Sequence, residues 1–259
     1  MKGKLKHKFE YLIYLFFLSL SKILPLFFLQ ILGKILGLIF IIFSKRKNII
    51  LKNLNLIFPS KTFFEKLKIL ISCSAHFGRV PFEYLKFTQK NNLIEKKIKI
   101  EGIENIKKVV NSRKGLFIVS AHFGNWEAAA LALSKIGFPQ GMVYRPLDNP
   151  YLEKALSLRR TLYGNWLIKK KGALKQILKD IRAGKIIDIL IDQKSLPEQS
   201  FKVKFLGKET YIISSLSKIV KITKAAVIFL FSYPEGSGYK VVLKEPLFYN
   251  NESELELTQ

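Results

Sequence analysis

A short apolar segment followed by a histidine constrains the fold more than any other part of the chain. Residues 116–120 read Leu-Phe-Ile-Val-Ser, which favours a buried strand, and residues 121–127 read Ala-His-Phe-Gly-Asn-Trp-Glu. On one continuous helix, His122 and Glu127 would point about 140° apart, because each residue turns a helix by about 100°. The pair therefore predicts a strand, a turn and a helix that begins near Gly124.

The two ionisable side chains of this segment suit general acid–base chemistry. At the carboxyl end of a strand, His122 occupies the position where open α/β sheets bind their ligands. Glu127, in the first turn of the next helix, is expected to reach back and orient the imidazole. The alternative is a hydrogen-bonded structural histidine beside a carboxylate that the helix dipole favours.

An amino-terminal run of Leu, Ile, Phe and Tyr at residues 11–43 is the second constraint. Four residues are its main interruptions: Lys22, Pro25, Gln30 and Lys34. A helix needs about 20 residues to cross a hydrocarbon core about 30 Å thick, and no uninterrupted stretch of the run has that length. One lysine must therefore be accommodated, either in a tilted span or in a helix lying partly in the interface. A buried core helix is the remaining alternative.

Charge and residue usage restrict the partners and cofactors. The chain has 44 Lys and Arg against 19 Asp and Glu, a formal net charge of +25. Such a field attracts anionic lipids, phosphorylated substrates, acidic proteins or nucleic acid. The sequence contains no recognisable nucleic-acid-binding motif, so nucleic acid is not an expected partner. A single cysteine, Cys73, excludes an intrachain disulfide, and three scattered histidines lack metal-binding spacing. We expect neither a metal nor a cofactor.

Strand-like and helix-like segments alternate after the amino-terminal run. Strands are predicted near Ile98 and Ile100 and at 115–120, 141–145, 186–192, 225–231 and 239–243. Helices are predicted at 125–135, 150–162, 172–183 and 211–223, and residues 63–88 are mostly helical with a break around Gly78 and Pro81. This alternation indicates an α/β fold with a mostly parallel central sheet flanked by helices. We expect a membrane anchor at 1–45 and a catalytic domain at 46–259.

Several separated segments carry a resemblance to a known family. Besides the His122 and Glu127 pair, they are the amino-terminal run, NLNLIFP at 53–59, Glu83, YRPLDNP at 144–150, Arg159-Arg160, Gly184, Asp192-Gln193 and FKVKFLGKET at 201–210. From about residue 11 to about residue 245, the chain resembles the late acyltransferases of lipid A biosynthesis, the lauroyl and myristoyl transferase family. The resemblance implies a glycerolipid-acyltransferase-like fold with an amino-terminal membrane-anchoring helix.

The reaction that the resemblance implies is acyl transfer. Such an enzyme moves a fatty acyl group from the thioester of acyl-carrier protein to a hydroxyl of an acyl chain on a lipid A precursor. His122 would be the general base, and Glu127 would hold its productive tautomer. Arg159 and Asp192 resemble further family positions that matter for activity. Asp192 would orient Arg159 through a salt bridge or simply cap a strand end.

Four more residues are candidates for substrate binding. The backbone amides around Gly124 and Asn125 are candidate donors to the tetrahedral oxyanion, and the Asn125 side chain is a weaker one. Arg145 and Arg160 are candidate phosphate contacts, with surface or structural salt bridges as the alternative.

The resemblance also implies partners, a location and a missing segment. Acyl-carrier protein, a lipid A precursor and anionic membrane lipids are the expected partners, on the cytoplasmic side of a bacterial inner membrane. Members of the family usually continue with a further helix where this chain ends in the acidic run 251–259, so we expect a truncated carboxyl terminus. The alternatives are a glycerol-phosphate or lysophospholipid acyltransferase, which usually carries Asp at the second motif position, and a non-enzymatic basic membrane protein that binds lipid or nucleic acid.

Overall fold

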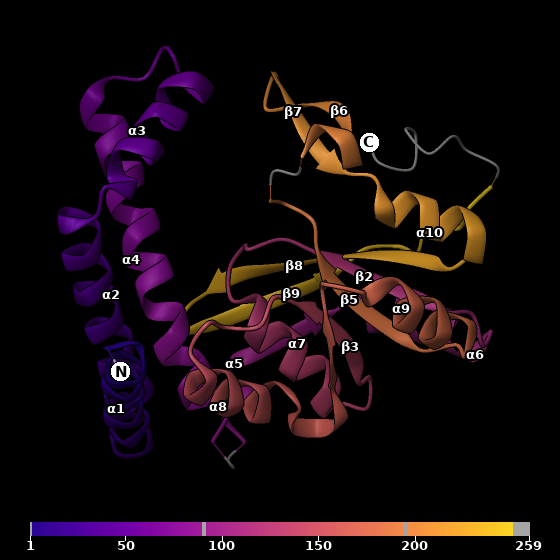
Figure 1. Cartoon of the computed structure of the whole chain (residues 1–259), viewed down its shortest axis with the longest axis horizontal. Helices are drawn as coiled ribbons and strands as arrows, with labels where there is room; N and C mark the ends of the chain where they lie inside the picture. The colour runs from indigo at the N-terminus through magenta and orange to yellow at the C-terminus, as the bar shows by residue number, and fades with distance from the viewer. Residues whose placement is uncertain (1, 90–91, 194–195, 251–259) are drawn as a thin grey trace. The chain divides into compact units, whose positions relative to one another are not determined.

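A computed structural model describes residues 2–89, 92–193 and 196–250, and its chain divides into two compact units (Figure 1). One unit contains residues 12–91 and 204–208, and the other contains the remainder. This division does not coincide with the predicted boundary at residue 45. The assignment of 1–45 as an anchor and 46–259 as a catalytic domain stays a prediction, and the acidic run 251–259 lies outside the described residues.

Four helices account for the amino-terminal third of the chain. They are α1 (Lys2–Ile23), α2 (Leu26–Phe43), α3 (Arg46–Ile57) and α4 (Phe63–Phe87). The expected single anchoring helix is thus two helices, because the chain breaks at Pro25, which precedes α2 with a φ of −57°. Proline lacks an N–H group and disfavours the helical conformation in the residue before it, so α1 ends at Ile23, two residues before the proline.

Helices α2 and α4 pack closely because glycines line their contact. A Cβ atom on Gly78 would clash with the carbonyl oxygen of Gly33 and the Cα of Gly37, so the two backbones approach directly. A cluster of polar side chains lies between the same two helices. The fully buried carboxylate of Glu83 accepts a hydrogen bond from Gln30 Nε2 at 2.8 Å and lies 3.2 Å from Arg79 Nε.

The predicted break in the helix at 63–88 is wrong. Helix α4 runs without interruption through Gly78 and Pro81, and it begins with a capping box between Thr62 and Glu65. The glycine is needed for the approach of α2, and buried residues surround the proline, including Val80 and Phe82. Tertiary packing therefore outweighs the local cost of these two residues in a helix.

Helix α2 is the one described helix that is long and apolar enough to cross a membrane. Its 18 residues have a mean hydropathy of 2.5, and 28% of them are buried. Several of its large apolar side chains are exposed, including Phe27, Phe28, Ile35, Ile39 and Phe40. Length and composition are weak evidence of membrane attachment, because the core helix of a soluble protein and a signal sequence can pass the same test.

A seven-stranded sheet forms the centre of the other unit. Its order is β1 (Ile98–Glu101), β9 (Gly238–Leu243), β8 (Ala226–Glu235), β2 (Leu116–Ser120), β5 (Ile186–Leu190), β3 (Gln140–Tyr144) and β4 (Trp166–Lys169). In this sheet every neighbouring pair is parallel except β8 and β9, which form an antiparallel hairpin. The predicted α/β fold with a mostly parallel sheet is confirmed.

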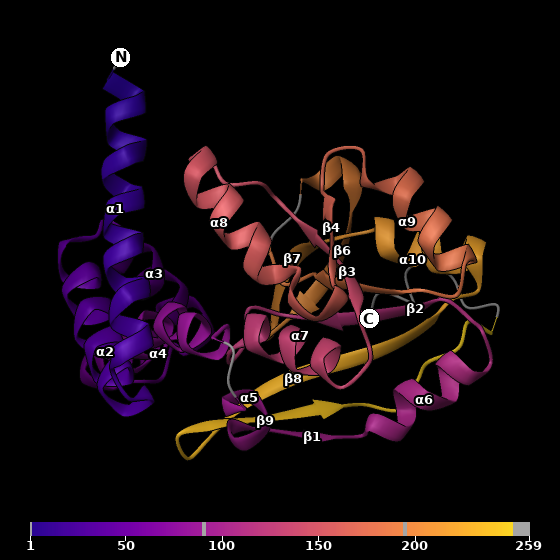
Figure 2. The ribbon, with the colours of Figure 1, turned by 90° about the horizontal axis from the view of Figure 1, so that it is seen from below.

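Helices cover both faces of this sheet (Figure 2). Helices α6 (Ile103–Asn111), α7 (Trp126–Lys135) and α8 (Pro150–Arg160) lie on one face, and α9 (Ala173–Arg182) and α10 (Ser215–Thr223) lie on the other. Every residue of β2 is buried, as expected for a central strand between two helical layers. A short helix, α5 (Leu93–Lys97), leads into β1.

Other parts of the fold also differ from the prediction. Strand β4 was not predicted, because its four residues are too few to show a hydrophobic period. Helix α6 was also missed, although Ile103, Ile106 and Val109 follow a helical spacing. The predicted helix at 211–223 is wrong over its first residues, which belong to a strand. Strands β6 (Ser200–Phe205) and β7 (Lys208–Ile213) pair with each other and form a separate hairpin (Figure 1). Single-turn 3₁₀ helices occur at Leu162–Gly164 and Pro197–Gln199.

The glycine contact between α2 and α4 predicts the effect of adding one methyl group. Alanine for glycine inside a helix normally stabilises it by about 1 kcal/mol. Gly78→Ala should instead destabilise the protein by about 1–3 kcal/mol, because the methyl group meets the α2 backbone. Thermal unfolding in detergent, followed by circular dichroism, would measure this. Gly3→Ala is the control, because a Cβ there meets nothing within 4 Å. Equal stability changes in both variants would contradict the packing argument.

Candidate active site

The register between β2 and β5 brings two distant residues together. The strands are parallel neighbours in which Ser120 lies opposite Leu190, and the Ile191 N–H donates to the Ser120 carbonyl at 3.2 Å. His122 and Asp192 each follow two residues after that pair. Both therefore leave the sheet at the carboxyl edge, side by side, although 70 residues separate them in sequence.

His122 makes two hydrogen bonds with the Asp192 carboxylate. Its ring Nδ1 lies 2.8 Å from Oδ1, and its backbone N–H donates to Oδ2 at 3.0 Å. Both side chains are about one-third exposed, at 31% and 35%. The imidazole and the Trp126 ring pack in a T-shaped arrangement, with 4.8 Å between ring centroids. A neutral imidazole that donates from Nδ1 carries its lone pair on Nε2, which is then the atom that can accept a proton.

The contact between His122 and Asp192 shifts the pKa of both side chains. The hydrogen bond to Asp192 raises the pKa of His122 above its ordinary value; partial burial opposes the rise, and the charges of Asp192 and Glu127 add to it. For Asp192, burial raises the pKa of the carboxyl, but the hydrogen bonds from the ring and backbone of His122 outweigh that and leave it lowered. The site therefore favours an anionic carboxylate beside an imidazole that readily takes up a proton.

The expected hydrogen bond between His122 and Glu127 is replaced by a different pairing. Glu127 lies in the first turn of α7, as predicted, but its carboxylate accepts hydrogen bonds from Arg160. The Arg160 Nε donates to both oxygens, at 3.1 and 3.0 Å, and Nη2 donates to Oε1. Asp192, which approaches through the sheet register, takes the position beside Nδ1 that the sequence assigned to Glu127.

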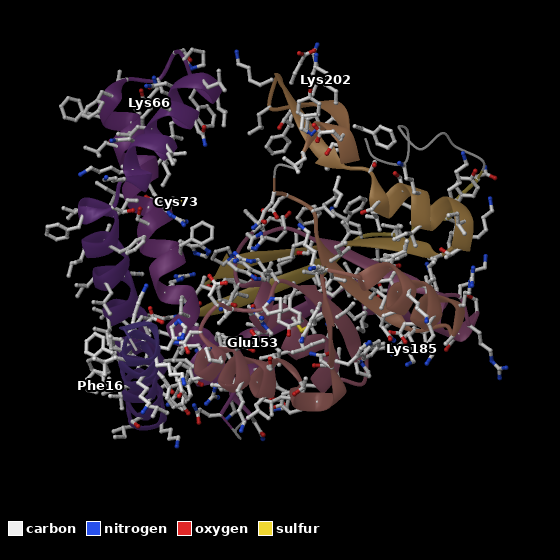
Figure 3. All side chains as sticks on the ribbon, viewed as in Figure 1. Phe16, Lys66, Cys73, Glu153, Lys185 and Lys202 are labelled. Atoms are coloured by element: carbon white, nitrogen blue, oxygen red, sulfur yellow. The ribbon has the colours of Figure 1, made fainter. Side chains whose placement is uncertain are left out.

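A network of polar side chains extends from Arg160 along β3 and α8. The guanidinium lies over the Tyr144 ring, 5.6 Å from its centroid, and the Tyr144 hydroxyl donates to Glu153 at 2.7 Å. Glu153, labelled in Figure 3, also accepts hydrogen bonds from the Ser157 hydroxyl and the Leu147 N–H. These contacts hold Arg160 in place, so its ion pair with Glu127 is a fixed part of the site.

The turn between β2 and α7 has a defined structural role. Gly124 has a φ of +63°, and a Cβ there would clash with the Ser232 carbonyl of β8. Asn125 is fully buried: its side-chain oxygen accepts from the Ala128 N–H as the cap of α7, and its own N–H donates to the Ser232 hydroxyl at 3.3 Å. Asn125 thus caps α7, and its role as a donor to the oxyanion stays a prediction.

The remaining predicted residues lie in different settings. Arg145 is highly exposed and pairs with Asp148, Nη2 to Oδ1, at 3.0 Å. Arg159 is half-buried in the last turn of α8, next to Arg160. Asp192 binds His122, whereas the sequence left open two roles for it, a salt bridge to Arg159 or the cap of a strand end. The roles of Gly124, Arg145 and Arg159 in substrate binding stay predictions.

One carboxylate of this region was not identified from the sequence. Asp188 lies in the middle of β5 and lines a small pocket together with Ser120, Trp126, Ala130, Gln140, Leu190 and Leu230. Burial raises its pKa to about 7, and the negative charge of Glu127 adds to the rise. The signal available in the sequence was a single charged residue inside the apolar segment Ile186–Leu190.

A family model for bacterial lipid A biosynthesis acyltransferases matches residues 2–259. The chain belongs to this family. Two relatives from Escherichia coli K12 are a lipid A biosynthesis lauroyltransferase and a palmitoleoyltransferase, each 25% identical. The matches cover 83% and 80% of this chain and 71% and 72% of the relatives. The resemblance found in the sequence is confirmed at the level of the family.

A lipid A biosynthesis acyltransferase of Haemophilus influenzae is also similar. It is 26% identical over 181 residues, which cover 69% of this chain and 57% of the relative. This family member thus spans little more than half the length of that protein.

The contact between His122 and Asp192 predicts which of two substitutions lowers the pKa of His122 more. Asp192→Asn should lower the pKa of His122 more than Glu127→Gln does, because the hydrogen bond to Asp192 is the largest cause of the raised pKa and the charge of Glu127 is the smallest. Proton NMR of the three imidazoles across pH would measure this, with His7 and His76 as internal controls. A larger fall in the Glu127 variant would reverse the assignment.

The raised pKa of Asp188 predicts that the stability of the protein depends on pH. Between the ordinary aspartate pKa of about 4 and the folded pKa of about 7, the folded protein holds a proton that the unfolded chain has lost. Stability should fall by about 1.4 kcal/mol per pH unit across that window, and by about 4 kcal/mol in total. Asp188→Asn should remove this slope in denaturant unfolding at pH 4.5 to 6, where His122 is protonated in both the folded and the unfolded chain. Asp148→Asn, at an exposed position, should retain it; a retained slope in both variants would exclude Asp188 as its source.

Proposed function

We propose that the protein transfers a fatty acyl chain from an acyl-carrier-protein thioester to a hydroxyl of an acyl chain on a lipid A precursor. The observation that carries this proposal is the contact between His122 and Asp192 at the carboxyl edge of the sheet, in a member of the lipid A acyltransferase family. Its Haemophilus and Escherichia coli relatives carry names of lipid A acyltransferases, which supports the same reaction class.

In the proposed mechanism, His122 acts as the general base through Nε2. A hydroxyl is a weak nucleophile at neutral pH, so its proton must move as the oxygen attacks the thioester carbonyl. The hydrogen bond from Nδ1 to Asp192 fixes the tautomer that exposes the Nε2 lone pair, and the carboxylate stabilises the imidazolium that forms. The thiolate leaves with a proton returned from the same ring. This direct transfer needs no covalent acyl-enzyme.

Glu127 has a second, electrostatic role in this proposal. Its negative charge contributes to the raised pKa of His122, although its hydrogen bonds go to Arg160. Because Arg160 is held by Tyr144 and by both oxygens of Glu127, the carboxylate stays at a fixed place near the imidazole. A preorganised charge of this kind stabilises an imidazolium without rearrangement during the reaction.

Charge and exposed apolar surface support the proposed partners and location. A net charge of +25 suits an acidic carrier protein, a phosphorylated acceptor and anionic lipids. The exposed apolar side chains of α2 suit a bilayer. We therefore place the protein at the cytoplasmic face of a bacterial inner membrane, where acyl-carrier protein and the lipid acceptor meet.

The test is acyl transfer from acyl-carrier protein to a tetra-acylated lipid A precursor, using the full chain in detergent micelles. His122→Ala should lower the rate by about 10²–10⁴-fold because it removes the base, and Asp192→Ala should lower it within the same range because it removes the group that fixes the tautomer of the base. His7→Ala is the matched control, because the backbone carbonyl of His7, which this substitution keeps, accepts a hydrogen bond from Asn149.

Two outcomes would contradict the proposal. Undiminished transfer by the His122 variant would exclude it as the base. Transfer to glycerol-3-phosphate or a lysophospholipid, offered in parallel, with none to the lipid A precursor, would assign the protein to the other acyltransferase class.

A further inference from the structure

The turn of the β6–β7 hairpin has an unusual residue at a strained position. Leu206 and Gly207 join the strands and have φ values of +49° and +75°. Two-residue hairpin turns with positive φ at both positions favour Asn, Asp or Gly, because a Cβ in this conformation crowds the backbone. Glycine meets this requirement at the second position. Leucine at the first does not, so local conformational preference does not explain it.

Burial does not explain this leucine either. Leu206 is 57% exposed, and the adjacent Phe205 is 64% exposed. Two large apolar side chains are thus exposed next to each other at the end of a hairpin. Single exposed apolar residues are common, but an adjacent pair on a strained turn indicates a surface that meets an apolar partner.

Basic residues surround this apolar tip. Lys204 and Lys208 flank the turn and are exposed, and Lys202, labelled in Figure 3, lies one pleat further along β6. Lys202 pairs with Glu209 at 2.7 Å. Lys202 and Lys204 alternate with Val203 and Phe205, so one face of β6 is basic and the other is apolar.

We propose that this hairpin tip, residues 202–208, inserts into the head-group region of an anionic bilayer. Phe205 and Leu206 enter the apolar boundary, and the lysines remain at the level of the lipid phosphates. This is the arrangement by which amphipathic elements bind membrane surfaces. The inference rests on the proposed membrane location, and it adds a contact formed by the hairpin itself, distinct from helix α2.

The shape of the tip favours lipid over an acidic protein as the partner. A protein partner needs a complementary pocket for a leucine and a phenylalanine at a two-residue turn, whereas fluid acyl chains adapt to any convex apolar surface. The lysines alone would suit an acidic protein, but they do not account for the apolar pair. Acyl-carrier protein is therefore the competing outcome that the test must separate.

The experiment places a fluorophore at the tip of the full chain. In a Cys73→Ser background, Leu206→Cys carries an environment-sensitive nitrobenzoxadiazole label, and Ser237→Cys, in the exposed β8–β9 turn, carries the same label as the control. The protein is reconstituted into vesicles of phosphatidylethanolamine and phosphatidylglycerol at 3:1. The label at position 206 should be protected from aqueous iodide and quenched by spin-labelled lipids, both at least several-fold more than the label at 237.

Charge variants and a lipid comparison complete the test. Each of Lys204→Gln and Lys208→Gln should reduce the equilibrium constant for insertion of the tip by about fivefold, which is the effect of one lysine near an anionic surface. Vesicles of phosphatidylcholine alone should reduce protection similarly. Equal quenching at 206 and 237, or protection of 206 that requires added acyl-carrier protein, would overturn the proposal. The fluorescence result does not depend on catalysis, so it remains distinguishable from a failure of the acyl-transfer assay.

Discussion

The candidate site depends on the parallel pairing of β2 with β5. Their hydrogen-bonded ladder continues past the last residues of the strands, through Ile191 to the Ser120 carbonyl, and so fixes the next residues of both chains. A shift of one residue in either strand would turn His122 or Asp192 to the opposite face of the sheet. The register of the two strands therefore determines the contact between His122 and Asp192. The buried residues of β2, which lie between two helical layers, hold that register.

A second ion pair completes the electrostatics of this edge. Glu127 and Arg160 neutralise each other at a half-buried position, where leaving either charge alone would be costly. Their arrangement keeps a carboxylate near His122 without competing for its Nδ1. Asp188 lies within β5, where burial raises its pKa and the negative charge of Glu127 raises it further. The site thus contains three carboxylates with different environments: one bound to His122, one paired with arginine and one within the sheet.

The sequence predicted the local geometry of the site and missed its long-range pairing. The strand, turn and helix around His122 are contiguous, so the spacing of His122, Gly124 and Glu127 was sufficient to predict them. The partner of His122 was not predictable in the same way. Glu127 is five residues away in sequence and Asp192 is 70, and only the order of strands in the sheet makes the distant residue the neighbour. The same limit applies to α4, where Gly78 permits the approach of α2 and does not break the helix.

The protonation of the His122 ring tests the central claim most directly. Long-range proton–nitrogen correlation NMR on the ¹⁵N-labelled protein, at a pH above the pKa of His122, identifies which ring nitrogen carries the proton. The contact with Asp192 predicts that it is Nδ1, with Nε2 as the acceptor, and that Asp192→Asn weakens this preference. A neutral ring protonated at Nε2 would place the lone pair against the carboxylate and contradict His122 as the base.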